Sequence, residues 1–278
     1  MLTISPADTR KLIQSVRLEY NHDLSAFCFN LLRYRVSLYL DQYRVEGIGH
    51  LLDHLLEDET AMDKFLSCIS AGSSELFRDP VMWKHLREQF IPEIISENRQ
   101  PVFWFPRSVS GHDAFSLLIL LAEDRIRYPY RIILSTSNFT DMQNIQAGIL
   151  NREFMNLSRE NYVKAGGRKS LDEYVDRNGN LSKLNPTRKI TFSRHFNMLH
   201  GGPGQVDLIM IRNQLINYKQ QEKNKLLNHF TEILKPGGIL VLGVKERIED
   251  KMVERKVVPQ VGHEGIYRKM MQKPDTLS

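Results

Sequence analysis

The spacing of apolar residues divides the chain into a helical first part and an alternating second part. Up to about residue 70, apolar residues recur every three to four positions, which is the period of a helix with one buried face. Ser5 and Pro6 begin the first of these segments with residue types that favour a helix start. From residue 101 onward, short apolar runs alternate with helical patterns. That alternation is typical of strands joined by helices.

The second part predicts an α/β fold built on a doubly wound, mostly parallel sheet. We expect strands at 101–105, 130–136, 189–193, 206–211 and 238–243, and helices at 80–90, 113–122, 141–149 and 220–234. In the helix at 80–90, Val81, Trp83 and Leu86 are expected on the buried side. Lys235-Pro236-Gly237-Gly238 predicts a turn, and 258–269 an antiparallel edge strand.

These changes of pattern suggest a division into domains. Residues 1–72 are expected to form a small all-helical N-terminal domain, and 73–98 a linker with a connecting helix. Residues 99–278 would form the α/β domain. Within it, 156–188 is a polar inserted segment that predicts a long connection without regular structure.

Charge and composition exclude some classes of protein. The net charge of +5 arises in residues 151–200, which hold ten Lys and Arg against five Asp and Glu. Such a segment suits an acidic protein, a membrane surface or nucleic acid, or is simply a solvated loop. No apolar run reaches the ~18 residues of a membrane span, and the N-terminus lacks a signal-peptide pattern. We therefore expect a cytoplasmic protein without membrane insertion.

Cysteine and histidine usage predicts no disulfide and no metal site. Cys28 and Cys68, the two cysteines, both stand in helical patterns and are expected to be free thiols. None of the histidines stands in a metal-ligand pattern.

A polar pair follows the strand expected at 206–211. In an open α/β sheet, ligands bind at the carboxyl ends of the strands. Arg212 and Asn213 therefore stand where a ligand would lie.

Five segments in matching order resemble motifs of the chemotaxis receptor methyltransferases, the CheR family. They lie at 74–80, 161–171, 196–198, 211–218 and 242–246, so the resemblance covers nearly the whole chain. It implies a class I methyltransferase-like fold. It also implies methyl transfer from the cofactor S-adenosylmethionine to glutamate side chains of a chemoreceptor, the partner protein.

The resemblance also implies roles for individual residues. Arg78 would orient the acceptor carboxylate, since its planar guanidinium can hold one by two hydrogen bonds, unless it serves a structural ion pair. Tyr218 would stand in for the catalytic tyrosine of the family, whose own position holds Asn217. The implied cofactor-binding residues are Ser74, Gly111, Asp113, Ser137, Asn197, Met198, Asn213 and Gln214. Arg33, Arg35 and Arg44 would form a basic face for acidic receptor helices, or else a solvated face.

The chain departs from the family pattern at the cofactor loops. Residues 106–113 read Pro-Arg-Ser-Val-Ser-Gly-His-Asp where the family has Ala-Gly-Cys-Ser-Thr-Gly-Glu-Glu, so Arg107 replaces a very small residue. Ser137 replaces an acid that would hold the ribose by charge-assisted hydrogen bonds, worth roughly 1.5–3 kcal/mol.

These departures leave three hypotheses open. The first is a CheR-type protein with weakened or lost S-adenosylmethionine binding that acts by binding a signalling protein. The second is an active methyltransferase that forms glutamyl methyl esters on chemoreceptors. The third, ranked last because only the basic segment supports it, is a nucleic-acid-binding relative.

Overall fold

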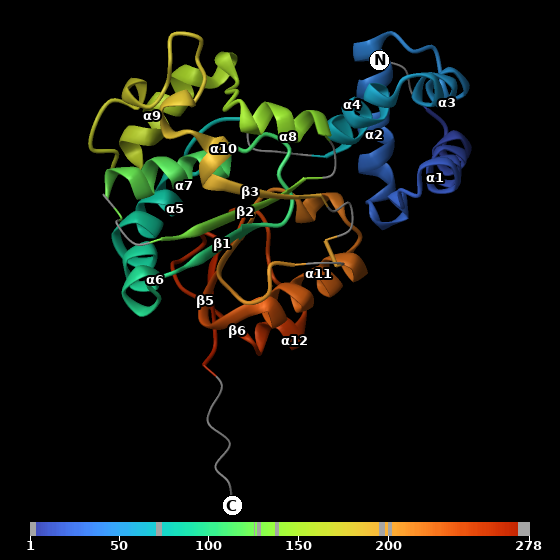
Figure 1. Ribbon diagram of the computed structural model, residues 1–278. Coiled ribbons are helices and arrows are strands. Elements are labelled where there is room, and N and C mark those ends of the chain that lie inside the picture. The colour runs from blue at the N-terminus through green and yellow to red at the C-terminus, as the bar shows by residue number, and fades with distance from the viewer. Residues whose placement is uncertain are drawn as a thin grey trace, which may run out of the picture.

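The computed structural model describes residues 4–70, 74–124, 126, 129–136, 139–194, 198–199 and 202–271. A group of N-terminal helices lies against one end of a central sheet, and further helices cover both faces of that sheet (Figure 1). Among the described residues, no helix is both long and apolar enough to cross a bilayer.

The N-terminal helices form where the apolar spacing predicts them. They are α1 (Pro6–Tyr20), α2 (Phe29–Tyr43), α3 (Ile48–Glu57) and α4 (Glu59–Ile69), with a short 3-10 turn η1 (Leu24–Ala26). Ser5 caps α1: its side chain accepts from the Asp8 amide, and the Asp8 carboxylate accepts from the Ser5 amide in return. The buried side chains of this group share one apolar cluster with Trp104 and Phe230 of the α/β part. The two parts of the chain therefore fold against each other.

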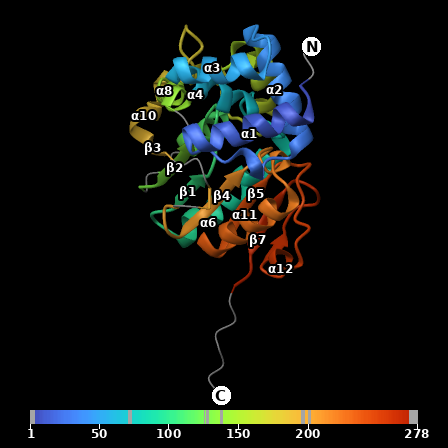
Figure 2. The same ribbon diagram turned by 90° about the vertical axis from the view of Figure 1, so that its right-hand side faces the viewer.

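Helix α4 is attached to α8 (Phe139–Gln146), which follows the carboxyl end of strand β2. The Asp63 carboxylate accepts from the backbone amides of Phe139 and Thr140, at 3.0 and 3.1 Å. Ser67 Oγ lies 2.9 Å from an oxygen of Asp141. These contacts place the N-terminal helices over the carboxyl ends of the strands (Figure 2).

The connecting helix is longer than predicted. It runs as α5 (Pro80–His85), a π-helical turn η2 (Leu86–Phe90) and α6 (Ile91–Glu97). Trp83 and Leu86 are buried as predicted, whereas the prediction for Val81 is wrong, since it is 52% exposed. Residues two apart on a helix point to different sides, so Val81 and Trp83 cannot both face the core.

The sheet confirms the predicted fold class. Seven strands lie in the order β3-β2-β1-β4-β5-β7-β6, and the pairings among β1 to β5 are parallel. The strands are β1 (Val102–Phe105), β2 (Arg131–Thr136), β3 (Ile190–Arg194), β4 (Val206–Ile211), β5 (Leu234–Leu242), β6 (Val257–Pro259) and β7 (Ile266–Lys269). The predicted single edge strand is thus an antiparallel pair, with β7 next to β5.

The predicted turn at Lys235–Gly238 is instead part of β5. Gly237 has φ +77°, which glycine adopts without strain, and the pairing of β4 with β5 shifts between Val206 and Leu208. An irregular strand therefore replaces the turn.

Helices on the two faces of the sheet contact alternating residues of β1. Phe103 and Phe105 belong to the apolar cluster that includes α7 (His112–Glu123), whereas Trp104 points the other way, toward α11 (Gln220–Ile233). Its ring packs edge-on against Phe230 at 5.7 Å. A short helix, α12 (Lys251–Glu254), follows β5 on the α11 side (Figure 1).

The prediction of a structureless segment at 156–188 is wrong. It contains α9 (Met155–Lys164), η4 (Leu171–Glu173), η5 (Ser182–Leu184) and α10 (Pro186–Lys189), and η3 (Arg152–Phe154) precedes it. Tyr162 and Tyr174 are buried, and both donate to the Glu123 carboxylate, which also lies 2.6 Å from Arg87 Nη1. Contacts with residues distant in sequence therefore order this segment. The polar local sequence does not reveal such contacts.

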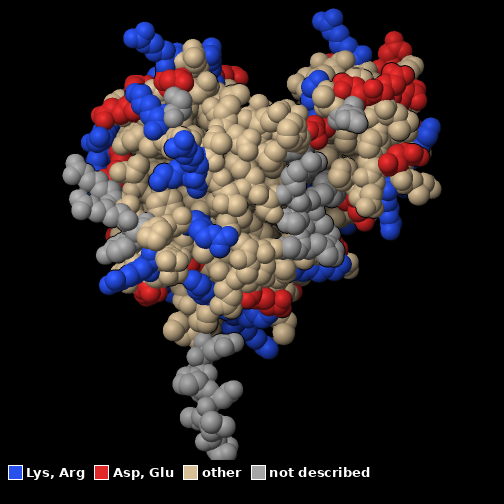
Figure 3. All heavy atoms as spheres, viewed as in Figure 1, with Lys and Arg blue, Asp and Glu red and all other residues tan. Residues whose placement is uncertain are grey.

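Several basic residues of 151–200 are paired with acidic residues of the same segment. Arg159 pairs with Asp172 at 2.8 Å, and Lys169 with Glu173 at 3.0 Å. Figure 3 shows acidic and basic residues intermixed at the α9 end of the molecule. The segment therefore presents mixed charge rather than a single basic stripe.

The Arg87–Glu123 pair gives a stability prediction. The two side chains are 3% and 1% exposed, so Arg87→Met leaves a buried carboxylate without its counter-charge. We expect a loss of about 3–5 kcal/mol in the free energy of unfolding, measured by urea denaturation. The control Lys84→Met removes an exposed pair 4.0 Å from Glu88 and should change stability by ~0.5 kcal/mol or less. Equal effects of the two substitutions would contradict the prediction.

Candidate functional site

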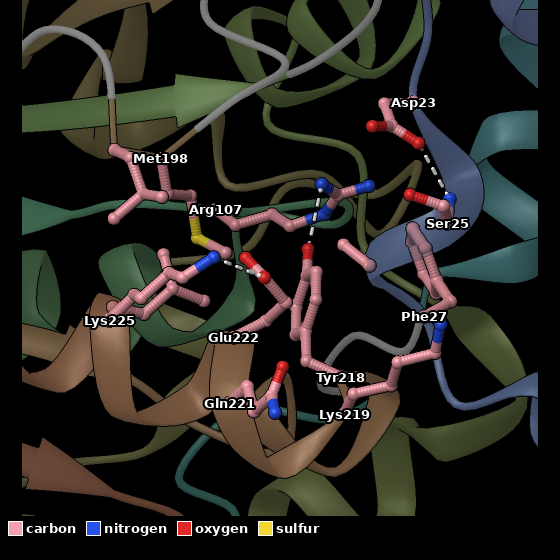
Figure 4. A pocket seen from close by; sticks show the side chains of 13 residues that line it. Asp23, Ser25, Phe27, Arg107, Met198, Tyr218, Lys219, Gln221, Glu222 and Lys225 are labelled. Atoms are coloured by element: carbon pink, nitrogen blue, oxygen red, sulfur yellow. Dashed lines mark hydrogen bonds and ion pairs between the residues drawn. The ribbon is translucent and has the colours of Figure 1, made fainter.

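A cavity of about 390 Å³, called here the main cavity, lies at the carboxyl ends of the strands, between η1 and the start of α11 (Figure 4). Its volume is in the range of small-molecule sites. It is lined by Asp23, Ser25, Ala26, Phe27, Arg107, Met198, Leu199, Tyr218, Lys219, Gln221, Glu222, Lys225 and Leu226.

Two distant segments form one wall of the main cavity. Phe27 and Tyr218 form an antiparallel bridge, and their rings lie 5.1 Å apart. The backbone amide of Cys28 donates to the Asn217 carbonyl at 2.7 Å, and that of Lys219 to the Ala26 carbonyl at 3.0 Å. The N-terminal helices are therefore part of the site.

Arg107 follows β1 and reaches into this wall. The residue is 7% exposed. Its Nη1 donates to the Tyr218 hydroxyl at 3.1 Å and its Nη2 to the Ser70 hydroxyl at 2.6 Å (Figure 4 shows the contact with Tyr218). Its guanidinium carbon lies 5.9 Å from the centre of the Phe27 ring. The structure thus directs Arg107 across the main cavity toward the N-terminal segment, an orientation that the sequence left open.

A second cavity, called here the minor cavity, has a volume of only about 10 Å³. It lies between the loop after β1, the start of α7 and the tip of β4. Its lining residues are Phe105, Arg107, Ser108, Val109, Ser110, His112, Asp113, Met210, Arg212 and Gln214. Arg107 is the one described residue that lines both cavities, so its side chain separates them.

Arg212 lines the minor cavity at the tip of β4, but its guanidinium is engaged by groups of the protein. Its side chain is completely buried and binds Asp113 at 2.8 Å and the Arg78 carbonyl at 2.8 Å. It also binds the Asp79 carboxylate. Two carboxylates compensate its buried charge, so Arg212 holds the linker and the start of α7 together, while the Asp113 side chain stays 14% exposed.

The tip of β4 is shaped by Glu246, which lies in the family-like motif at 242–246 but was not among the predicted site residues. Its carboxylate accepts from the backbone amides of Gly243, Asn213 and Ile216, at 2.7, 2.8 and 3.2 Å. Burial raises the pKa of Glu246, and these backbone hydrogen bonds partly oppose the rise. The contacts hold Asn213 at φ +56°.

Three amide side chains at this tip retain hydrogen-bonding capacity. Asn213 Nδ2, Gln214 Oε1 and Asn217 Oδ1 are buried and have no hydrogen-bond partner among the described residues. Buried polar atoms are nearly always paired, with protein, water or ligand. These amides are therefore suited to hold a polar ligand.

The predicted site residues divide into groups. Met198 and Tyr218 line the main cavity, and Asp113 and Gln214 line the minor one, while Asn213 is next to Gln214. The predicted positions Ser137 and Asn197 lie outside the described residues.

Arg78 and Ser74 lie on the linker and line neither cavity. The Arg78 side chain is 36% exposed, and its Nε is 3.8 Å from Glu75 Oε1, a loose version of the structural ion pair considered above. Ser74 Oγ also donates to Glu75. Arg78 thus keeps a partly exposed guanidinium.

Gly111 is explained by local structure. It has φ +72° at the start of α7, and a Cβ there would lie 2.9 Å from Ile145 Cγ2. It lines neither cavity, so packing and the turn account for glycine at this position.

The prediction of one basic face is wrong for Arg35. Its Nη1 donates to the Ile69 carbonyl at 2.6 Å, and it lies two residues from Arg33, hence on another side of α2. Burial, and also the positive charge of Arg107, lowers the pKa of Arg35, while Cys68 opposes this. Arg33 is half-buried and Arg44 exposed, and their partner role stays a prediction.

The residues present fit one half of S-adenosylmethionine. The main cavity suits a nucleoside in size, and Met198, Phe27 and Tyr218 can pack on a base. The minor cavity cannot hold the methionine half while Arg107 lies where it does. The adenosine end therefore fits, and the amino-acid end requires Arg107 to move.

His112, in the minor cavity, gives a pH prediction. Burial lowers its pKa from 6.5 to about 4, and the nearby Asp113 opposes this. Since the folded pKa is depressed, His112 contributes stability above pH 6.5 that is lost as the pH falls through about 4. Between pH 7.5 and pH 4, wild type should lose up to about 3 kcal/mol more unfolding free energy than His112→Gln.

The measurement is urea denaturation at several pH values. His263→Gln, at an exposed position, should follow the pH dependence of wild type. Parallel curves for wild type and His112→Gln would show that His112 does not titrate as expected.

Comparisons with known proteins agree with this geometry. The family model described as CheR methyltransferase, SAM binding domain matches residues 72–262. Cher3 of Pseudomonas putida, which is named a methyltransferase only provisionally, is 26% identical over 264 residues, covering 94% of this chain and 96% of its own. The chemotaxis protein methyltransferase of Listeria monocytogenes is 23% identical over 236 residues, covering 84% and 87%.

Solved structures are more distant. An O-methyltransferase family protein from Burkholderia thailandensis is aligned over 87% of this chain and 71% of its own, with 11% identity and a TM-score of 0.39. The family match alone spans well over half of the 278 residues. The chain belongs to the CheR methyltransferase family.

Proposed function

We propose that this protein is a CheR-type methyltransferase with weakened affinity for S-adenosylmethionine, which forms methyl esters on glutamate side chains of a chemoreceptor-type signalling protein. One observation carries the proposal. A nucleoside-sized cavity lies at the carboxyl ends of the strands, with Met198 and Tyr218 in its wall. The buried amides of Asn213 and Gln214 lie on the adjoining strand tip.

Methyl transfer to a carboxylate needs little acid–base catalysis by the protein. S-adenosylmethionine supplies an activated methyl group, and a glutamate carboxylate is already a nucleophile. The protein must therefore align the acceptor and exclude water. Arg78 suits the alignment, because its guanidinium is partly exposed and can bind a carboxylate by two hydrogen bonds, while its backbone carbonyl is held by Arg212.

Weakened affinity follows from Arg107. Its guanidinium separates the main cavity from the minor cavity, where the methionine half would extend. Two positive charges about 4 Å apart repel by roughly 4 kcal/mol near a protein surface, so this side chain also disfavours a sulfonium. Replacement of the family acid by Ser137 acts in the same direction.

A second candidate, binding of the signalling protein without methyl transfer, is favoured by the contact between Arg107 and Ser70. This contact holds the Arg107 side chain across the main cavity, toward the N-terminal helices. Association with a receptor fragment that is unchanged by S-adenosylmethionine, together with absent methyl esters, would support this role.

Methyl transfer is tested with radiolabelled S-adenosylmethionine and a chemoreceptor cytoplasmic fragment. Base-labile radioactivity identifies carboxyl esters. We expect Arg78→Ala to lower the initial rate by about a hundredfold or more, because the acceptor loses its orienting cation. Lys84→Ala, at an exposed position on α5, should retain the wild-type rate. No ester with wild type at millimolar donor would refute the proposal.

A further inference from the structure

Arg107 bounds the main cavity on the side of the minor cavity. It is the one described residue shared by the two cavities, and beyond it only about 10 Å³ is open. A ligand of the main cavity therefore meets the guanidinium of Arg107 at the point where S-adenosylmethionine would have to continue. The cavity as it stands suits a shorter ligand than the family cofactor.

The charge at this wall is positive. Arg107 is only 7% exposed, and its contacts include two neutral hydroxyls, those of Ser70 and Tyr218. Arg35 is close enough for its charge to be affected by that of Arg107. Lys219 is a further cation of the lining.

The acidic residues of the lining, Asp23 and Glu222, have their partners within the lining itself. Glu222 pairs with Lys225 at 2.7 Å, and the Asp23 carboxylate accepts from the Ser25 amide at 2.8 Å. The wall at Arg107 therefore favours an anion.

We propose that the main cavity binds a nucleoside 5′-phosphate, with the nucleoside against Met198, Phe27 and Tyr218 and the phosphate on Arg107. Aromatic and methionine side chains pack on bases without needing a charge. A guanidinium binds phosphate by parallel charge-assisted hydrogen bonds, which are stronger than hydrogen bonds to neutral hydroxyls such as those of Ser70 and Tyr218. This inference goes beyond the proposed methyl transfer and does not depend on it.

A 5′-phosphate matches both the space that the main cavity offers and the positive charge at its wall. A 5′-phosphate is a short group, so the ligand ends at Arg107 and leaves the minor cavity closed. S-adenosylmethionine needs the space on both sides of this side chain. The two ligands would therefore compete, and a nucleotide would limit access of the methyl donor.

The test is calorimetric titration of the full chain with adenosine 5′-monophosphate, adenosine and inorganic phosphate. We expect the monophosphate to bind at least about tenfold tighter than either of the other two. Arg107→Met, which keeps length without charge, should bring the monophosphate and adenosine within about twofold of each other. Arg107→Lys, which keeps the charge without the planar fork, should retain part of the difference.

Arg255→Ala is the matched control. Arg255 is exposed, beyond α12, and its loss lowers the net charge by the same amount without touching the cavity. It should leave all three affinities unchanged. Thermal unfolding of each variant shows whether it is folded.

Several results would overturn the proposal. They are equal affinities for adenosine and its monophosphate, inorganic phosphate binding as tightly as the nucleotide, an undiminished nucleotide preference in folded Arg107→Met, or no nucleotide binding at millimolar concentration. Methyl-ester formation is read separately, so a failure of the nucleotide site leaves the proposed methyl transfer standing, and the reverse also holds.

Discussion

The arrangement of the loops at the carboxyl ends of the strands depends on one buried guanidinium, that of Arg212, at the tip of β4. A charge without solvent must be paired, and Arg212 meets this requirement with Asp79 from the linker and Asp113 from the start of α7. It also binds the carbonyl of Arg78, between two residues of positive φ, Phe77 and Asp79. Three segments distant in sequence are thus fixed at the carboxyl ends of the strands, and Arg78 is positioned by its backbone.

Arg107 is buried as well but plays a different part. The carboxylate partners of Arg212 come from the linker and α7, whereas the contacts of Arg107 include a hydroxyl and an aromatic ring from the N-terminal segment. Hydroxyls and rings hold a cation less strongly than carboxylates do. Arg212 therefore acts as a fixed support, whereas Arg107 is the guanidinium on which the proposed nucleotide would place its phosphate.

Local periodicity predicted the helices and strands because each buries one face, and the parallel sheet followed from their alternation. It could not predict what depends on distant partners. Residues 156–188 are ordered by Glu123, and Arg212 is paired with acids more than ninety positions away, as the separation of Asp113 from it shows. The family motifs predicted Met198 and Tyr218 as site residues, and both line the main cavity. No sequence signal indicates that Arg35 turns inward and donates to the Ile69 carbonyl.

The loop after β1 changes one end of the ligand site and leaves the other end in place. Met198 and Tyr218 still form a surface that can pack on a base, and the amides of Asn213 and Gln214 remain on the adjoining tip. Arg107 bounds the main cavity on the side of the minor cavity, which Asp113 lines, and it also contacts Ser70. If the proposed nucleotide binds, we expect a substitution of Arg107 to alter the length and charge of the accepted ligand more than its base, because the guanidinium sets the size and charge of the wall and the base packs by flat apolar contact. An altered cofactor loop is therefore compatible with membership of the family.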